Sequence, residues 1–224
     1  MARHLKEHQL RIVLLGASEV GKTAIVKRFV QGVFAEGYEP TIEDSFQKDL
    51  MIPTVWWQEY CADDNQMQCK TATKTISINL TIVDTSGEEE IASNLRSLYL
   101  HNADAFVLVY SICSLASLKA LEPIAKEIKK IHGDQALRML IVIGNKCDGL
   151  GEQDREVTLE KATEWTQEQG IAEPLEASAR SDLHIEKIFK GLIRQRLTGR
   201  TPFEAVDPNP GKPERTKKHH CQIA

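Results

Sequence analysis

The stretch Gly16-Ala17-Ser18-Glu19-Val20-Gly21-Lys22-Thr23 decides the fold of this chain. It matches the pattern G-x-x-x-x-G-K-[ST] and lies between an apolar run at residues 10–15 and a segment at 22–30 with apolar residues at helical spacing. The pattern predicts a strand, a phosphate-binding loop and a helix, in that order. The glycines let backbone N–H groups surround phosphate groups, and the helix directs the positive end of its dipole toward them.

Two side chains of this loop have distinct expected roles. Lys22 would reach the β- and γ-phosphates of a nucleotide, and the hydroxyl of Thr23 suits Mg²⁺, which prefers hard oxygen ligands. The other residues expected to contact the nucleotide here are Gly16, Ala17, Ser18, Glu19, Val20, Gly21 and Ala24. This loop indicates a nucleotide but does not select its base.

The rest of the chain repeats the strand and helix alternation. Apolar runs at 75–83, 105–112 and 137–143 are each followed by a stretch of helical character, with helices expected at 115–131, 159–169 and 185–196. The expected fold is α/β, a three-layer P-loop NTPase with a mostly parallel central sheet and helices on both faces. Residues 1–197 would form this domain, and the Pro- and Gly-containing segment 198–224 would be a disordered tail.

Composition limits the classes of function. With 224 residues and 42% hydrophobic residues the chain can bury one substantial core, and a net charge of -4 argues against a protein that coats nucleic acid. Five scattered cysteines do not form the paired framework of a secreted domain. The first ten residues carry charges, and no apolar run approaches the length of a membrane span, so we expect neither a secreted nor a transmembrane protein.

A second motif selects the base. Asn145-Lys146-Cys147-Asp148 follows the run at 137–143, which places it at a carboxyl end of the sheet, where open α/β folds bind ligands. The carboxylate of Asp148 would accept from N1–H and the 2-amino group of guanine, whereas adenine would leave it unpaired. In Ser178-Ala179-Arg180, the backbone N–H of Ala179 would donate to the guanine oxygen. Together the two motifs predict a guanine nucleotide.

At this point the residues resemble the Ras family of small GTPases, over residues 9–196. The segment 38–46 resembles the first switch of that family, in which Thr41 would bind Mg²⁺ and the γ-phosphate only in the GTP state. Tyr38 would contact the nucleotide, and the effector surface would consist of Ile42, Glu43 and Asp44. Phe34 matches the aromatic ring that packs against the guanine.

Asp84-Thr85-Ser86-Gly87 resembles the second switch of the family. Asp84 would hold Mg²⁺ through water, and Gly87 would donate its N–H to the γ-phosphate. The resemblance implies a monomeric switch that binds GTP or GDP with Mg²⁺, hydrolyses GTP slowly and meets effectors, exchange factors and activating proteins. The catalytic residues would be Lys22, Thr41, Gly87 and Glu88.

Three residues depart from the family pattern near the phosphates. Ser18 and Glu19 stand where Ras proteins usually have glycines, and Glu88 stands where they usually have a water-orienting glutamine. Glu88 also reads as a solvated acid at the start of a helix. Two hypotheses therefore stay open: a slowly hydrolysing switch, and a mainly GTP-bound binding module. A P-loop kinase is disfavoured, because the motif at 145–148 specifies guanine.

An insertion at 52–73 separates the two switches. The connection is about twenty residues longer than in a typical Ras protein, a length that is uncommon without function. We expect an extended hairpin that turns near Asp63-Asp64-Asn65 and uses Trp56 and Trp57 for packing or for a partner surface. A metal site at Cys61 and Cys69 is disfavoured, because the segment has neither His nor C-x-x-C spacing.

The C-terminus carries a lipidation motif. Cys221-Gln222-Ile223-Ala224 fits C-a-a-X, and a terminal Ala usually directs farnesylation of the cysteine. One lipid chain binds membranes only marginally, and a second signal would come from Lys212, Arg215, Lys217 and Lys218. The expected location is the cytoplasmic face of the plasma membrane or of an endomembrane.

Overall fold

The computed structural model describes residues 7–37, 41, 43–53, 75–87, 98–148 and 154–198. Its centre is a six-stranded sheet with the order β2-β3-β1-β4-β5-β6. The strands are β1 (Glu7–Leu15), β2 (Glu43–Pro53), β3 (Thr75–Thr85), β4 (Ala105–Ser111), β5 (Leu140–Asn145) and β6 (Leu175–Glu176). All neighbouring strands run parallel except β2 and β3, which are antiparallel.

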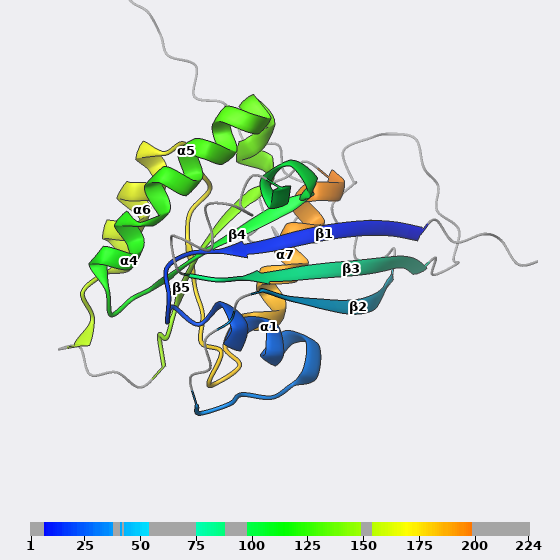
Figure 1. Ribbon diagram of the computed structural model, residues 1–224, viewed down its shortest axis with the longest axis horizontal. Coiled ribbons are helices and arrows are strands. Elements are labelled where there is room, and N and C mark those ends of the chain that lie inside the picture. Colours follow the sequence, from blue (N-terminus) through cyan, green and yellow to red (C-terminus); the bar gives the residue numbers. More distant parts are fainter. Residues whose placement is uncertain are drawn as a thin grey trace, which may run out of the picture.

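Helices cover both faces of this sheet (Figure 1). They are α1 (Lys22–Gln31), α4 (Leu115–Lys119), α5 (Leu121–His132), α6 (Leu159–Glu168) and α7 (Ile185–Thr198), with a 3₁₀ helix at Gly133–Arg138. On one side α1 and α7 pack against the sheet, and on the other α5 and α6 do. This architecture confirms the predicted three-layer α/β fold.

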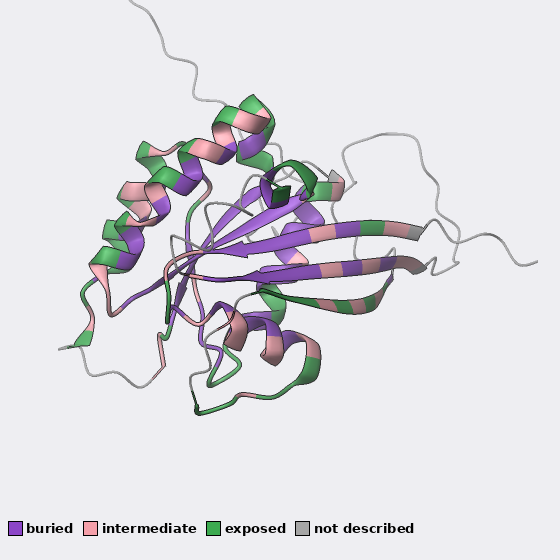
Figure 2. Ribbon diagram, in the orientation of Figure 1, coloured by how far each residue is buried: buried purple, intermediate pink, exposed green. Residues whose placement is uncertain are grey.

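Successive side chains of each central strand pack into two different halves of the hydrophobic core. In β1, Ile12 and Leu14 join the cluster under α1 and α7, whereas Val13 and Leu15 join the cluster under α5 and α6. Successive strand residues point to opposite faces, so a strand covered on both sides is apolar throughout. Figure 2 accordingly shows the central strands buried along most of their length.

The structure differs from the sequence-based expectations at several elements. The strand expected at 137–143 begins at Leu140, because residues 133–138 form the 3₁₀ helix and leave Leu137 38% exposed. The helix expected at 115–131 is divided at Ala120 into α4 and α5. Strand β6 was not predicted, and β2 was expected only as one arm of the hairpin between the switches. β6 has only two residues, and β2 is an edge strand whose alternate residues face solvent.

Of the hairpin expected between the switches, the structure describes the two strands β2 and β3 but not the connection between them. β2 and β3 stay paired as far as Pro53 opposite Thr75, and Ile52 is buried in the core. The first residues of the segment 52–73 therefore belong to β2. Residues 54–74, with Trp56 and Trp57, lie outside the described part of the chain.

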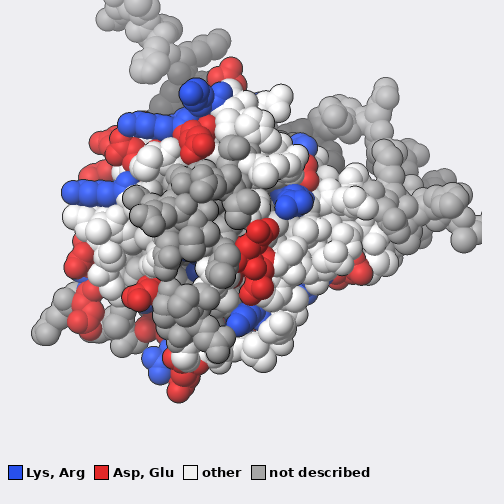
Figure 3. Space-filling model, in the orientation of Figure 1, with Lys and Arg blue, Asp and Glu red and all other residues white. Residues whose placement is uncertain are grey.

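The described surface mixes charges of both signs, as Figure 3 shows for one face. This distribution agrees with the small net charge of -4. Among the described residues, no helix combines the length and the apolar character needed to cross a bilayer.

Candidate functional site

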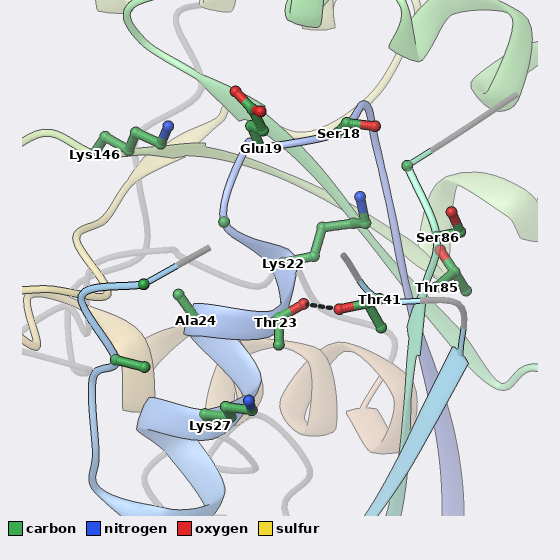
Figure 4. Close-up of a pocket in the computed structure, with 14 residues that line it drawn as sticks. Ser18, Glu19, Lys22, Thr23, Ala24, Lys27, Thr41, Thr85, Ser86 and Lys146 are labelled. Carbon is green, nitrogen blue, oxygen red and sulfur yellow. Dashed lines mark hydrogen bonds between the residues drawn. The ribbon is translucent and has the colours of Figure 1, made fainter. Parts of the chain in front are cut away.

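A pocket of about 500 Å³ opens where β1 and β3 end and α1 begins (Figure 4). Of the predicted residues, it is lined by Ser18, Glu19, Gly21, Lys22, Thr23, Ala24, Thr41, Gly87 and Lys146. It is also lined by residues that the sequence analysis did not select: Lys27, Ala35, Gly37, Thr85 and Ser86. Because β1 and β3 are parallel neighbours, the loops that follow them meet at one edge of the sheet.

The phosphate loop depends on its two glycines. Gly16 has a φ of +149°, and a Cβ there would lie 2.2 Å from the Val109 carbonyl oxygen. Gly21 has a φ of +94°, and a Cβ there would lie 2.3 Å from Asn145 Nδ2. No larger residue fits there without displacing a neighbour. The carbonyls of Gly16 and Ala17 face inward and accept hydrogen bonds from Lys22 Nζ at 2.9 and 2.8 Å.

Lys22 is buried at the base of this loop. Burial lowers the pKa of its ammonium to about 8, and the carboxylate of Asp84 acts in the opposite direction. Lys22 is therefore a cation held by backbone carbonyls in a partly dry pocket, where its charge acts more strongly than in water.

The sequence predicts that Thr23, Thr41 and Asp84 bind the metal ion. The hydroxyls of Thr23 and Thr41 lie 2.9 Å apart, which brings the single described residue of the segment 38–42 against α1 (Figure 4). Asp84 is fully buried at the end of β3, and neither of its carboxylate oxygens has a hydrogen-bond partner among the described residues.

The environment of Asp84 fits a divalent cation. Burial raises the pKa of this carboxyl to about 6, and the neighbouring Thr23 hydroxyl opposes the rise most strongly, followed by the ammonium of Lys22. A buried carboxylate without partners is costly unless a cation compensates it. Two hydroxyls and a carboxylate are hard oxygen donors, the kind that Mg²⁺ prefers, so the residues present fit this ion.

Gly87 lies against the phosphate loop. A Cβ at this position would lie 2.2 Å from the backbone nitrogen of Ser18 and 2.4 Å from its Cα. The loop after β3 thus contacts the loop after β1 directly, and only a residue without a side chain allows this approach.

A second pocket of about 330 Å³ adjoins the first. It is lined by Gly21, Ala24, Phe34, Ala35, Glu36, Gly37, Asn145, Lys146, Asp148, Ala179 and Arg180. Several residues line both pockets: Gly21, Ala24, Ala35, Gly37 and Lys146. The motif at 145–148, the ring of Phe34 and the loop at 178–180 therefore come together beside the phosphate loop.

Asn145 connects the three loops of this second pocket. Its Nδ2 donates to the Val20 carbonyl at 2.8 Å, and its Oδ1 accepts from the Ala179 N–H at 3.2 Å. The asparagine is buried, so both ends of its amide are satisfied inside the protein. The Ala179 N–H, which the sequence analysis assigned to a guanine oxygen, donates to Asn145 in this structure.

Arg28 supports the same loop from α1, and no sequence motif pointed to it. Its Nε donates to the Ala179 carbonyl and one terminal nitrogen to the Arg180 carbonyl, each at 2.9 Å. The guanidinium carbon also lies 5.9 Å from the centroid of the Phe34 ring. Arg28 thus links α1 to two parts of the second pocket, a role that depends on folding and is not visible in the local sequence.

The remaining predicted residues fall into three groups. Those that line neither pocket are Gly16, Ala17, Val20 and Ser178, which contribute backbone or turn structure, and the buried Asp84. Glu43 and Asp44 are exposed at the start of β2, and Asp44 lies opposite Asp84 in the strand register. The predictions for Tyr38, Ile42, Glu88 and Cys221 lie outside the described residues.

Comparison with models of known protein families matches residues 11–198 to the Ras family. The match begins within β1 and ends with the last residue of α7. It therefore includes both pockets and every loop that lines them.

Proposed function

The chain belongs to the Ras family and is thus a small GTPase of the switch type, and we propose that it binds GTP and GDP with Mg²⁺ and hydrolyses GTP slowly. The observation that carries the proposal is the pair of adjoining pockets, one at the phosphate loop and one at the 145–148 motif, joined by Asn145. A phosphate site next to a base site of this kind is suited to one nucleotide that spans both.

Phosphate binding falls to the loop at 16–23. Its backbone N–H groups and the start of α1 provide partial positive charge, and Lys22 provides a full charge at the same place. Lys22 would exchange its carbonyl partners, Gly16 and Ala17, for β- and γ-phosphate oxygens. The same lysine would stabilise charge that develops on those oxygens during hydrolysis.

Thr23, Thr41 and Asp84 would hold Mg²⁺, with Asp84 acting through water. When bound, the ion neutralises phosphate charge. The hydroxyl of Thr41, 2.9 Å from that of Thr23, and the N–H of Gly87 would both hold the γ-phosphate. GDP lacks this group, so hydrolysis would release both loops and change the surface that effectors meet, formed by Ile42, Glu43 and Asp44.

Glu88 is proposed to act on the attacking water, in the place of the usual glutamine. A carboxylate there can accept a proton from water or repel the γ-phosphate. These two effects oppose each other, so we keep a second candidate function. In it, the protein is a GTP-bound binding module with negligible hydrolysis. Ser18 and Glu19, which line the phosphate pocket with side chains where glycines are usual, favour it. Phosphate release in a single turnover of bound GTP separates the two functions.

Guanine recognition rests on Asp148, with Lys146 and Phe34 lining the same pocket. We expect the protein to bind GTP and GDP and to reject ATP by roughly 10⁴-fold, the discrimination typical of a site whose polar groups a wrong ligand leaves unpaired. Asp148→Asn exchanges one acceptor for a donor, so this variant should lose affinity for guanine nucleotides and gain affinity for xanthine nucleotides. Competition against a fluorescent GDP measures all of these affinities.

The matched control is Asp154→Asn, an exposed acid outside both pockets. It should bind GTP, GDP and ATP like the unchanged protein. Equal affinity of the unchanged protein for ATP and GTP would refute the assignment of the base.

We further propose a membrane-bound signalling role. A prenyl group on Cys221 would anchor the monomer to the cytoplasmic face of a membrane, and the basic residues of the tail would add attraction to anionic lipids. Effectors, exchange factors and activating proteins of the kind that serve the Ras family are the expected partners. The motif at 221–224 and the family membership support this proposal.

A further inference from the structure

A single guanidinium, that of Arg28, connects α1 to two segments of the chain that lead to the base pocket. Arg28 is half-buried near the end of α1, and the loop at 178–180 lies beside this helix (Figure 1). Its Nε donates to the Ala179 carbonyl and one terminal nitrogen to the Arg180 carbonyl, each at 2.9 Å. The other terminal nitrogen donates to the Gly32 carbonyl at 3.0 Å. One side chain thus holds carbonyls from two separate parts of the sequence.

Both segments provide residues of the base pocket. Gly32 directly follows α1, and two residues later the ring of Phe34 lies 5.9 Å from the guanidinium carbon and lines the pocket. Ala179 and Arg180 line the same pocket. Arg28 lines neither pocket, so any effect on a ligand must pass through the residues that it holds. Because a guanidinium is planar and its donors have a fixed geometry, it positions these segments relative to each other.

The contacts of Ala179 show what this arrangement fixes. Ala179 is buried, its carbonyl accepts from Arg28, and its N–H donates to Asn145 Oδ1 at 3.2 Å. Both backbone polar groups of the residue are therefore held, which fixes the direction of the N–H that the proposed function assigns to the guanine oxygen. Without Arg28 the carbonyl of this buried residue would lose its partner, and the loop would gain by moving it toward water.

We propose that Arg28 is a positioning residue for guanine. By holding the loop at 178–180 and the segment of Phe34 together, it prolongs the lifetime of the bound nucleotide and directs the Ala179 N–H toward the guanine oxygen. The inference rests on the proposed function, because it requires guanine in the second pocket. Lysine would be a poor substitute, since its ammonium is a point charge on a flexible stem and does not match the fixed fork of arginine.

The release of fluorescent GDP from the full-length protein into excess unlabelled GDP, at saturating Mg²⁺, tests the effect on lifetime. Arg28→Ala should accelerate release by about ten- to hundredfold, because hydrogen bonds made by charged groups are the stronger ones. Arg28→Lys should accelerate release by a smaller factor, since it keeps the charge and part of the hydrogen bonding. This second variant decides the question if Arg28→Ala does not fold.

Base analogues test the direction of the Ala179 N–H separately. In 6-thio-GDP the guanine oxygen is replaced by sulfur, a weaker acceptor, whereas the N1–H and 2-amino groups that Asp148 would bind are kept. Inosine diphosphate keeps the oxygen and lacks the 2-amino group. Arg28→Ala should reduce the preference for GDP over 6-thio-GDP by at least about threefold, and should keep the preference for GDP over inosine diphosphate.

Lys129→Ala is the matched control. Lys129 is also a half-buried cation of a helix that donates to a backbone carbonyl, that of Gln169. It lies on α5, which packs on the opposite face of the sheet from α1. Lys129→Ala should lower the resistance to chemical denaturation and leave GDP release and both base preferences unchanged. The same denaturation measurement checks that the Arg28 variants are folded.

The outcomes distinguish the inference from the proposed function. If the unchanged protein does not prefer GDP over inosine diphosphate, the assignment of the base itself is wrong. If it has this preference but both Arg28 variants release GDP at the unchanged rate, only the role of Arg28 is wrong. An equal loss of affinity for GDP and both analogues, or an equal acceleration of release in Lys129→Ala, would indicate general loosening of the fold and would also overturn the positioning role.

Discussion

Ser18 meets Gly87 at the mouth of the phosphate pocket, with backbone atoms close enough to exclude any side chain at residue 87. The side chain of Ser18 is exposed there, where an activating protein would bring an arginine toward the phosphates. Glu19, the next residue, has φ +62°, in the left-handed region that residues with a side chain adopt at a cost. Both residues stand where Ras proteins usually have glycines. We therefore expect them to affect the GTP hydrolysis that an activating protein stimulates.

We predict that Ser18→Gly increases the GTP hydrolysis stimulated by a Ras-type activating protein by at least about tenfold. The reason is that a hydroxymethyl group crowds the arginine, whose contribution of about 10³ to 10⁵ in rate is the magnitude established for Ras itself. The measurement is the rate of GTP hydrolysis with and without the activating protein. Strong stimulation of the unchanged protein, unaltered in the variant, would contradict the prediction.

At the level of elements, α1 carries much of the site and is held in place by α7. Lys22, Thr23, Lys27 and Arg28 all lie on α1. On its buried side Phe29 stacks on Phe189 of α7, with ring centroids 3.8 Å apart and planes inclined by 14°. Apolar packing of this kind positions the polar residues at the start of the helix, because an isolated helix of ten residues is marginal in water.

Phe189→Ala should therefore destabilise the protein strongly. Phe189 is fully buried, and truncation of a buried phenylalanine to alanine costs about 3–5 kcal/mol, a large part of a typical free energy of unfolding. Chemical denaturation at saturating GDP measures the change. Leu183→Ala, at a residue that is 44% exposed, is the control and should change the free energy of unfolding by less than about 0.5 kcal/mol. Similar values for the two variants would refute the role of the α1 and α7 contact.

At the level of the whole molecule, the sheet brings the functional loops to one edge. β1, β3 and β5 run in one direction, because β1 pairs in parallel with β3 and β4, and β4 with β5. Their carboxyl ends lead into the phosphate loop, the segment 84–87 and the 145–148 motif, respectively. The membrane anchor is instead proposed at the end of the chain, after the last described helix.

Membrane attachment should depend on Cys221 and not on the nucleotide site. Cys221→Ser removes the only thiol of the C-a-a-X motif, so the variant should move from the membrane fraction to the cytosol. Its GDP affinity should stay unchanged. Cys113→Ser, at a half-buried cysteine of the domain, is the control and should remain at the membrane. Unchanged fractionation of Cys221→Ser would refute the anchor.

The sequence by itself determined the fold class and the positions of the phosphate loop and the base motif. These features are local: the positive φ angles at residues 16 and 21 favour glycine, and alternating strand and helix patterns predict a parallel sheet. The family resemblance then indicated Thr41, Asp84 and Gly87.

Only the tertiary structure decided which residues support the site. Asn145 bonds to Val20 across 125 residues of sequence and to Ala179 across 34, and Arg28 reaches Ala179 across 151. Motifs and periodicity report on neighbours along the chain, whereas these contacts exist only once distant segments have packed together.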